Sequence, residues 1–109
     1  MRGIDFRQAR AEIRLAEVLE LLDYQRRQRW SEQLRGPCPV HGSQSATSRS
    51  FAAHLGKNVW QCFRCGASGN ALDLWAAVTR QRIYAAVLDL YRRLGRRPPF
   101  IKETTMPEP

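Results

Sequence analysis

Hydrophobic residues recur at helical spacing near both ends of the chain and alternate with polar residues in its centre. The first helical stretch begins after Asp5, a predicted N-cap, and runs to Leu22 as either one helix or two short ones. A later helix is predicted to begin at Ala71, and a final one to run from 82 to 94 and end at Gly95. In the final helix, the buried row is predicted to consist of Ile83, Val87, Leu90 and Leu94.

The centre of the chain is predicted to form short strands. Residues 50–55 and 59–63 are separated by a Gly-Lys-Asn turn at 56–58, in which glycine and asparagine tolerate positive φ. A further edge strand is predicted at 30–35, before a Gly-Pro pair. The chain is therefore expected to place a small β-hairpin between helical ends.

Four potential metal ligands lie in two short motifs within this centre. Cys38 and His41 are spaced C-x-x-H, Cys62 and Cys65 are spaced C-x-x-C, and together they use all three cysteines. Two side chains separated by two residues on a tight turn can reach one ion from adjacent corners of a tetrahedron. Three thiolates and one imidazole suit zinc and close its coordination shell, which indicates one structural ion with no position for a catalytic water.

A redox role or a disulfide role for the cysteines fits the sequence less well. A redox C-x-x-C pair would require a βαβ context and would leave Cys38 and His41 unexplained. A disulfide framework would leave one of the three cysteines unpaired, and the N-terminus has no secretory signal. The second histidine, His54, competes with His41 as a ligand but falls on the polar side of a predicted strand. His41 is therefore the predicted fourth ligand.

Composition indicates a small basic domain with an anionic partner. The chain has 109 residues and a formal net charge of +8, from 18 Lys and Arg against 10 Asp and Glu. Such an excess favours a polyanion as the first partner to consider. No apolar run approaches the length of a membrane span, and reduced cysteines favour the cytoplasm. One domain is predicted at 1–97, followed by a flexible tail or linker at 98–109.

The motifs GPCPVH and SFAAHLGKNVWQCFRCGASGNALDLW resemble the zinc-binding domain at the N-terminus of bacterial-type, DnaG-like DNA primases. The similarity is specific from Gly36 to about Trp75. It implies a small α+β fold in which a zinc-ribbon hairpin, at about 33–69, is flanked by N-terminal and C-terminal helices. It also implies that the module helps to recognise single-stranded template DNA, while a separate Toprim-type domain performs nucleotidyl transfer. The implied zinc ligands are Cys38, His41, Cys62 and Cys65.

The sequence departs from the primase pattern in two places. The loop after His41 is longer than usual and lacks the Glu-Lys-Thr-Pro-Ser run of the family. Only fifteen residues follow Leu94, which are too few for a Toprim domain. The chain is therefore expected to be non-catalytic, as either the first domain of a primase or a free-standing protein with the same module.

Basic and aromatic residues near the ribbon are the predicted contacts to single-stranded DNA. Phosphates would be bound by arginine and lysine, while Trp60 and Phe63 either stack on bases or fill the core around the metal. The alternative function is a protein-interaction adaptor, in which Tyr84, Leu88 and Tyr91 dock a polymerase, helicase or mobile-element protein. The predicted nucleic-acid contacts are Arg64, Arg49, Lys57, Arg35, His54 and Trp60.

Overall fold

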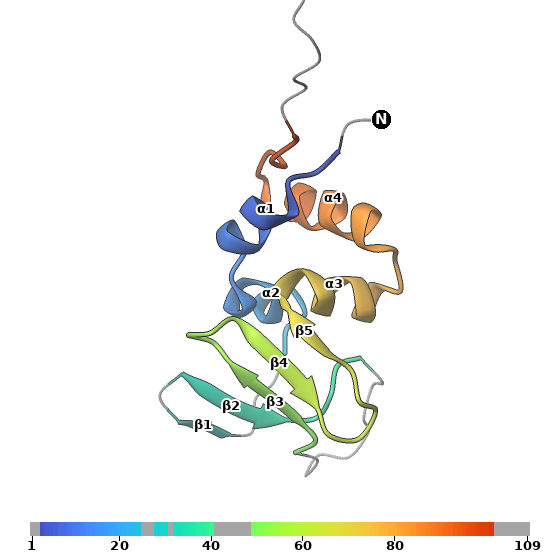
Figure 1. Ribbon diagram of the computed structural model, residues 1–109. Coiled ribbons are helices and arrows are strands. Elements are labelled where there is room, and N and C mark those ends of the chain that lie inside the picture. The colour runs from blue at the N-terminus through green and yellow to red at the C-terminus, as the bar shows by residue number, and fades with distance from the viewer. Residues whose placement is uncertain (1–2, 25–27, 31, 41–48, 102–109) are drawn as a thin grey trace, which may run out of the picture.

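The structure, a computed structural model, combines one antiparallel sheet with a layer of helices at one end of it (Figure 1). It describes residues 3–24, 28–30, 32–40 and 49–101. Within these ranges the sheet has five strands in the order β1-β2-β3-β4-β5, so each strand pairs with its neighbours in sequence. The predicted α+β class, with a hairpin core flanked by helices, is confirmed.

The N-terminal helical stretch forms two short helices, α1 (Phe6–Glu12) and α2 (Leu15–Leu21). The predicted cap is confirmed, because the Asp5 carboxylate accepts the Gln8 backbone N–H at 3.1 Å. Between the helices, Ile13 and Arg14 have extended backbone angles. The question of one helix or two, which the hydrophobic spacing leaves open, is therefore decided in favour of two.

The central hairpin is confirmed by β3 (Phe51–His54) and β4 (Val59–Cys62), which pair antiparallel. The single strand predicted at 30–35 is wrong. The chain instead reverses there to form β1 (Gln28–Trp30) and β2 (Gln33–Gly36), with Trp30 opposite Gln33. Polar residues occupy most of this stretch, so its hydrophobic pattern contains no mark of the reversal.

A fifth strand, β5 (Ser68–Asn70), is not predicted by its sequence, because glycine, serine and asparagine have low strand propensity. Pairing with β4 imposes the extended conformation. Gly69 has φ +154, and a Cβ there would lie 2.5 Å from the Asp73 side chain. Glycine is therefore required where β5 passes the start of the next helix.

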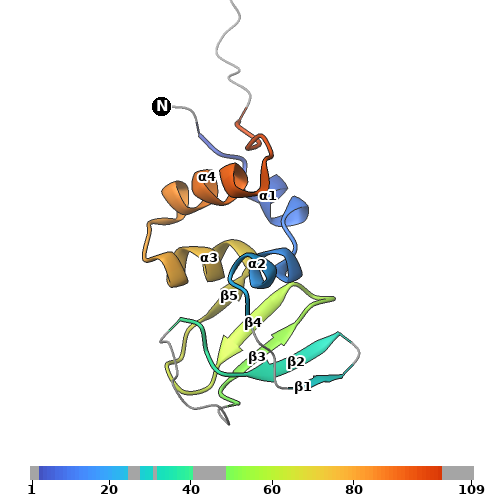
Figure 2. The same cartoon turned by 180° about the vertical axis from the view of Figure 1, so that it is seen from behind.

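The C-terminal half contributes α3 (Ala71–Thr79) and α4 (Ile83–Leu94). Asn70 and Asp73 cap α3 reciprocally, each side chain accepting the backbone N–H of the other residue. Gly95 ends α4 with φ +70, as predicted. Both views show α3 between α4 and the sheet, with α4 as the outer helix (Figures 1 and 2).

The predicted buried row of α4 is partly wrong. Ile83 is 39% exposed, whereas Tyr91 is fully buried and its hydroxyl donates to the Glu12 carboxylate at 2.5 Å. α4 packs mainly against α3, and Tyr91 also reaches α1 through its bond to Glu12, so the buried surface of α4 is shifted around the helix towards Tyr91. The buried residues of α4 are Ala86, Val87, Leu90 and Tyr91.

The packed part of the chain extends past the predicted boundary at residue 97. Phe100 forms an isolated antiparallel bridge with Ile4, and the Ile101 N–H donates to the Gly3 carbonyl at 2.7 Å. On the other side of the bridge, the Asp5 N–H donates to the Pro99 carbonyl. The first residues of the predicted tail therefore belong to the folded unit, while residues 102–109 lie outside the described ranges.

Candidate metal centre and nucleic-acid interface

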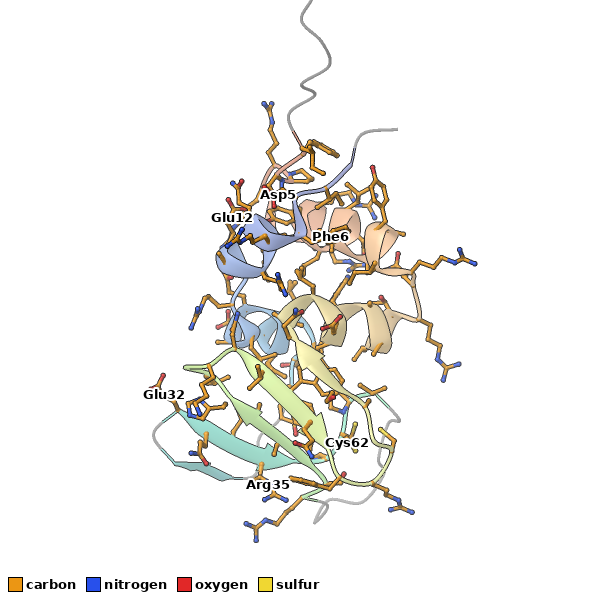
Figure 3. The ribbon with its side chains drawn as sticks, in the orientation of Figure 1. Asp5, Phe6, Glu12, Glu32, Arg35 and Cys62 are labelled. Atoms are coloured by element: carbon orange, nitrogen blue, oxygen red, sulfur yellow. The ribbon has the colours of Figure 1, made fainter. Side chains whose placement is uncertain are left out.

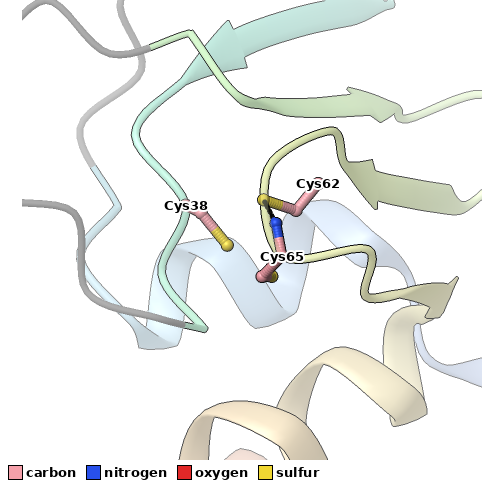
Figure 4. A group of neighbouring side chains, drawn as sticks. All are labelled: Cys38, Cys62 and Cys65. Carbon is pink, nitrogen blue, oxygen red and sulfur yellow. Dashed lines mark hydrogen bonds between the residues drawn. The ribbon is translucent and has the colours of Figure 1, made fainter.

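Three cysteines from two separate segments of the chain converge at one point (Figure 4). Cys38 follows β2, Cys62 is the last residue of β4, and Cys65 lies in the turn that leads towards β5. Their sulfur atoms all lie within 4.8 Å of one another. Cys38 and Cys62 are each 1% exposed, whereas Cys65 is exposed. The two motifs identified in the sequence are therefore joined in space through their cysteines.

The turn after β4 presents Cys62 and Cys65 to the same point. The Cys65 N–H donates to Cys62 Sγ at 3.3 Å, and the Gly66 N–H donates to the Cys62 carbonyl at 3.0 Å. Gly66 has φ +79, a conformation that favours glycine. The Cys62 N–H then donates to the Ala67 carbonyl, which returns the chain to the sheet. Backbone hydrogen bonds therefore hold the knuckle formed by residues 62–67.

The surroundings of Cys62 favour its thiolate form. Burial alone would raise the pKa of this thiol, but the N–H groups of Cys65 and Arg64 and the thiols of Cys65 and Cys38 lower the pKa to about 6. A tetrahedral zinc ion with Zn–S bonds of about 2.3 Å places its sulfur ligands about 3.8 Å apart. The sulfur separations, the soft thiolate donors and the lowered pKa all fit such an ion.

The two histidines are the remaining candidates for the fourth zinc ligand. His41 lies outside the described residues, so its role as the fourth ligand stays a prediction. His54 is not a member of the cysteine group among the described residues, and its Nδ1 accepts the Lys57 N–H at 3.1 Å. This bond occupies one ring nitrogen of His54 in the turn between β3 and β4.

Comparison with known proteins identifies the module. A family model described as the CHC2 zinc finger matches residues 4–105, which include both motifs. The chain belongs to this family. CHC2 zinc fingers of the primase type bind zinc, and the cysteine group is the part of this chain whose chemistry suits that ion.

Relatives and a solved structure carry the same module within longer proteins. The chain is 36% identical over 58 residues to the DNA primases of Synechocystis sp. and Synechococcus elongatus, which covers 53% of this chain. It spans only 9% and 8% of their lengths. A crystal structure of the Aquifex aeolicus primase, containing its zinc-binding and RNA polymerase domains, superposes with a TM-score of 0.68 at 23% identity. That match covers 98% of this chain and 24% of the other. The likeness confirms the fold of this CHC2 module.

The sheet of this CHC2 module has two chemically different faces. Along β3 and β4, side chains on one face are buried in the core, including Phe51, whose ring stacks on Trp60 with centroids 5.8 Å apart. On the other face, cross-strand partners Arg35, Ala52 and Gln61 form one row. We call this second face the open face; it consists of Gln33, Arg35, Ala52, His54, Val59, Gln61 and Ser68.

An open groove of about 790 Å³ runs over the open face. Lys57 from the β3–β4 turn, Arg10 from α1 and Asp73 from α3 are among the residues that line it. Arg10 is not among the predicted contacts, because its sequence distance from the ribbon gives no sign of its proximity. Gln61, which also lines the groove, is not among the predicted contacts either. The alternation of inward and outward side chains along β4 would have indicated its outward position. Figure 3 shows Arg35 at the end of the sheet that points away from the helices.

The predicted nucleic-acid contacts fall in different places. Arg64 is exposed on the knuckle and Lys57 is exposed in the turn, while His54 is half-buried on the open face. Arg35 donates to the Arg49 carbonyl, which brings these two residues together near the knuckle. Of the two alternatives for Trp60, the structure favours core packing over base stacking: this side chain is 3% exposed, and its indole N–H donates to the Asn70 carbonyl at 2.7 Å. It shares the inner face with Cys62, two residues away, as strand periodicity requires.

The surface suggested for an adaptor role is less accessible than the sequence implies. Tyr91 is fully buried, and Tyr84 and Leu88 are half-buried against the core. None of the described helices is long and apolar enough to cross a membrane.

Proposed function

We propose that this chain is a non-catalytic module that binds single-stranded DNA across the open face, with one structural zinc ion fixing the adjoining knuckle. The observation that carries the proposal is the groove over the open face, which Arg10 and Lys57 line together with one carboxylate, Asp73. Two further cations lie outside the groove lining: Arg35 on the open face and Arg64 on the knuckle. A net charge of +8 adds long-range attraction for a polyanion.

Zinc supports this function by holding the edge of the binding face. We propose Cys38, His41, Cys62 and Cys65 as its ligands, which closes the coordination shell and leaves the metal a structural role. Cys62 ends β4, whose alternate residues supply the open face. Loss of the ion would therefore loosen β4, the turn after it and the position of Arg64.

The shape of the open face suits an unpaired strand. Its central residues are small or uncharged, namely Ala52, Gln61 and Ser68, and leave room for bases. The flanking cations provide contacts for a phosphate backbone, and such contacts make affinity fall with salt. The relatives are DNA primases, which agrees with a role in priming DNA synthesis. Nucleotidyl transfer is assigned in this proposal to a different domain or protein.

Fluorescence anisotropy of labelled single-stranded and duplex DNA, titrated with zinc-loaded protein at two salt concentrations, tests the proposal. We expect preference for the single strand and a steep loss of affinity with salt. Arg64→Ala and Lys57→Ala should each weaken binding. Arg82→Ala is the matched control, because Arg82 is exposed at the start of α4, makes no capping bond and carries the same charge. Equal effects of all three variants would contradict a defined binding face.

A further inference from the structure

Phe63 is the most exposed large hydrophobic residue among the described residues, at 59%. It lies in the knuckle between Cys62 and Arg64, directly after β4. A phenyl ring exposed to this degree gains little stabilisation from burial and presents aromatic surface to solvent.

The position of Phe63 is fixed from two sides. Its backbone N–H donates to the Ser50 carbonyl at 2.8 Å, which extends the β3–β4 pairing by one step. On the other side, Cys62 belongs to the metal centre. The ring therefore stands on a rigid base although it is largely exposed to solvent.

One side of the ring is covered by a guanidinium. Arg35 Cζ lies 5.2 Å from the centroid of the Phe63 ring. The same guanidinium donates from Nε to the Arg49 carbonyl at 3.2 Å, and from Nη2 to the same oxygen. Arg35 is thus held by a backbone acceptor over one side of a ring that is 59% exposed.

We propose that Phe63, backed by Arg35, forms a subsite on the knuckle beside the open face, where one nucleobase stacks. A base on the free side of the ring would complete a layer of base, phenyl ring and guanidinium, in which the cation also polarises the aromatic surface. Ala52, the cross-strand partner of Arg35, has a small side chain, and the exposed Arg64, next to Phe63 in the chain, would bind the adjacent phosphate. Arg35 is a positioning residue in this arrangement. The inference rests on the proposed function, because it names a base subsite beside that DNA-binding face.

The test separates base contacts from phosphate contacts. A labelled oligothymidylate and a strand of the same length built from abasic nucleotides are each titrated with the full, zinc-loaded chain at fixed salt. Stacking of one base should make the base-bearing strand bind about 5-fold to 100-fold more tightly than the abasic strand. Phe63→Leu, which keeps apolar bulk but removes the aromatic ring, should reduce that ratio to about 1 without weakening the abasic strand.

Two further variants distinguish stacking from a loss of structure. Phe63→Trp should keep the preference for bases, because it retains an aromatic surface. Arg35→Lys keeps the charge and removes the planar guanidinium, so it should lower the preference while leaving the salt dependence unchanged. Zinc content and melting temperature are measured for each variant, and Phe63→Leu should change neither, because its ring is exposed.

Loss of all DNA binding and loss of the preference for bases would have different meanings. If the unchanged protein binds neither strand, the proposed function is overturned and this inference falls with it. If it binds both strands equally, or if Phe63→Leu retains the preference, DNA binding stands and the stacking subsite is overturned. A second optical readout, the fluorescence change of 2-aminopurine placed in the strand, should disappear with Phe63→Leu if the base stacks on this ring.

Discussion

The Asn58 side chain accepts the backbone N–H of Leu15 at 2.5 Å and so caps a helix that lies 43 residues earlier in the chain. Its amide nitrogen also donates to the Ile13 carbonyl at 3.0 Å. Asn58 is in the β3–β4 turn with φ +62. Arg14, between the two helices, reinforces the contact by donating to the Leu55 carbonyl. The turn of the ribbon therefore sets the break between α1 and α2.

Asn58→Gly should destabilise the zinc-loaded domain by about 1–3 kcal/mol, because it leaves the partly buried backbone groups of Ile13 and Leu15 without partners. Glycine tolerates the positive φ, so the substitution isolates the side-chain bonds from backbone strain. Urea unfolding followed by circular dichroism measures the change. Lys57→Gly, at the exposed neighbouring position, serves as the control and should change stability much less.

His41→Ala should weaken zinc binding more than about 100-fold, because loss of a direct ligand should exceed the 10–100-fold cost of losing an outer partner. His54→Ala is the matched control and should leave zinc affinity unchanged, since its Nδ1 is bonded to the Lys57 N–H. Competition with a chromogenic chelator measures both affinities. Equal losses in the two variants would contradict the predicted ligand set.

Trp60→Phe should cost about 1–3 kcal/mol of stability, because the buried indole fills the core beside Phe51 and its N–H bonds to the Asn70 carbonyl. DNA affinity should remain unchanged under conditions where the variant is folded and zinc-loaded. Thermal unfolding and anisotropy with the same protein samples measure the two effects. A selective loss of DNA binding at full stability would restore Trp60 as a contact residue.

Asp89→Asn should destabilise the domain at neutral pH by about 1–3 kcal/mol. Burial tends to raise the pKa of this carboxyl, but hydrogen bonds from the Trp75 indole, Arg92, Gln81 and Arg93 hold it below its ordinary 3.8. A depressed pKa in the folded state gives stability that is present above about 3.8 and lost as the pH falls through the folded value.

The stability difference between the original chain and Asp89→Asn should therefore shrink in acid. Urea unfolding at neutral pH and below pH 3.8 measures this difference. Acid release of zinc is common to both proteins and cancels in the comparison. A difference that stays constant with pH would show that the charge of Asp89 is not what stabilises the α3–α4 connection.

A chain ending at Arg97 should be less stable than one ending at Ile101, because it loses the backbone bonds that join 99–101 to 3–5. Each such bond contributes about 0.5–1.5 kcal/mol, and half-buried Phe100 adds packing against the core. Thermal unfolding of the two truncated proteins measures the change. Identical melting temperatures would support the earlier boundary at 97.

Much of the architecture follows from short-range patterns. The caps Asp5 and Asn70, the helix stop at Gly95 and the hairpin around 56–58 are local features, and all occur as expected. Strands of three or four residues carry too little hydrophobic pattern to reveal themselves, which explains the reversal between β1 and β2 and the unexpected β5. The buried side of α4 differs from the prediction because Tyr91 is fully buried and its hydroxyl bonds to Glu12 of α1.

The kind of metal chemistry follows from the order of residues without knowledge of the fold, since thiolate and imidazole donors at two-residue spacing on turns require no distant information. The periodic segments and their caps follow in the same way. Packing between distant segments is what brings Arg10 to the groove and places Asn58 between the two N-terminal helices. These placements depend on which segments pack together in the folded protein. Contacts between distant residues leave no periodic pattern in the sequence.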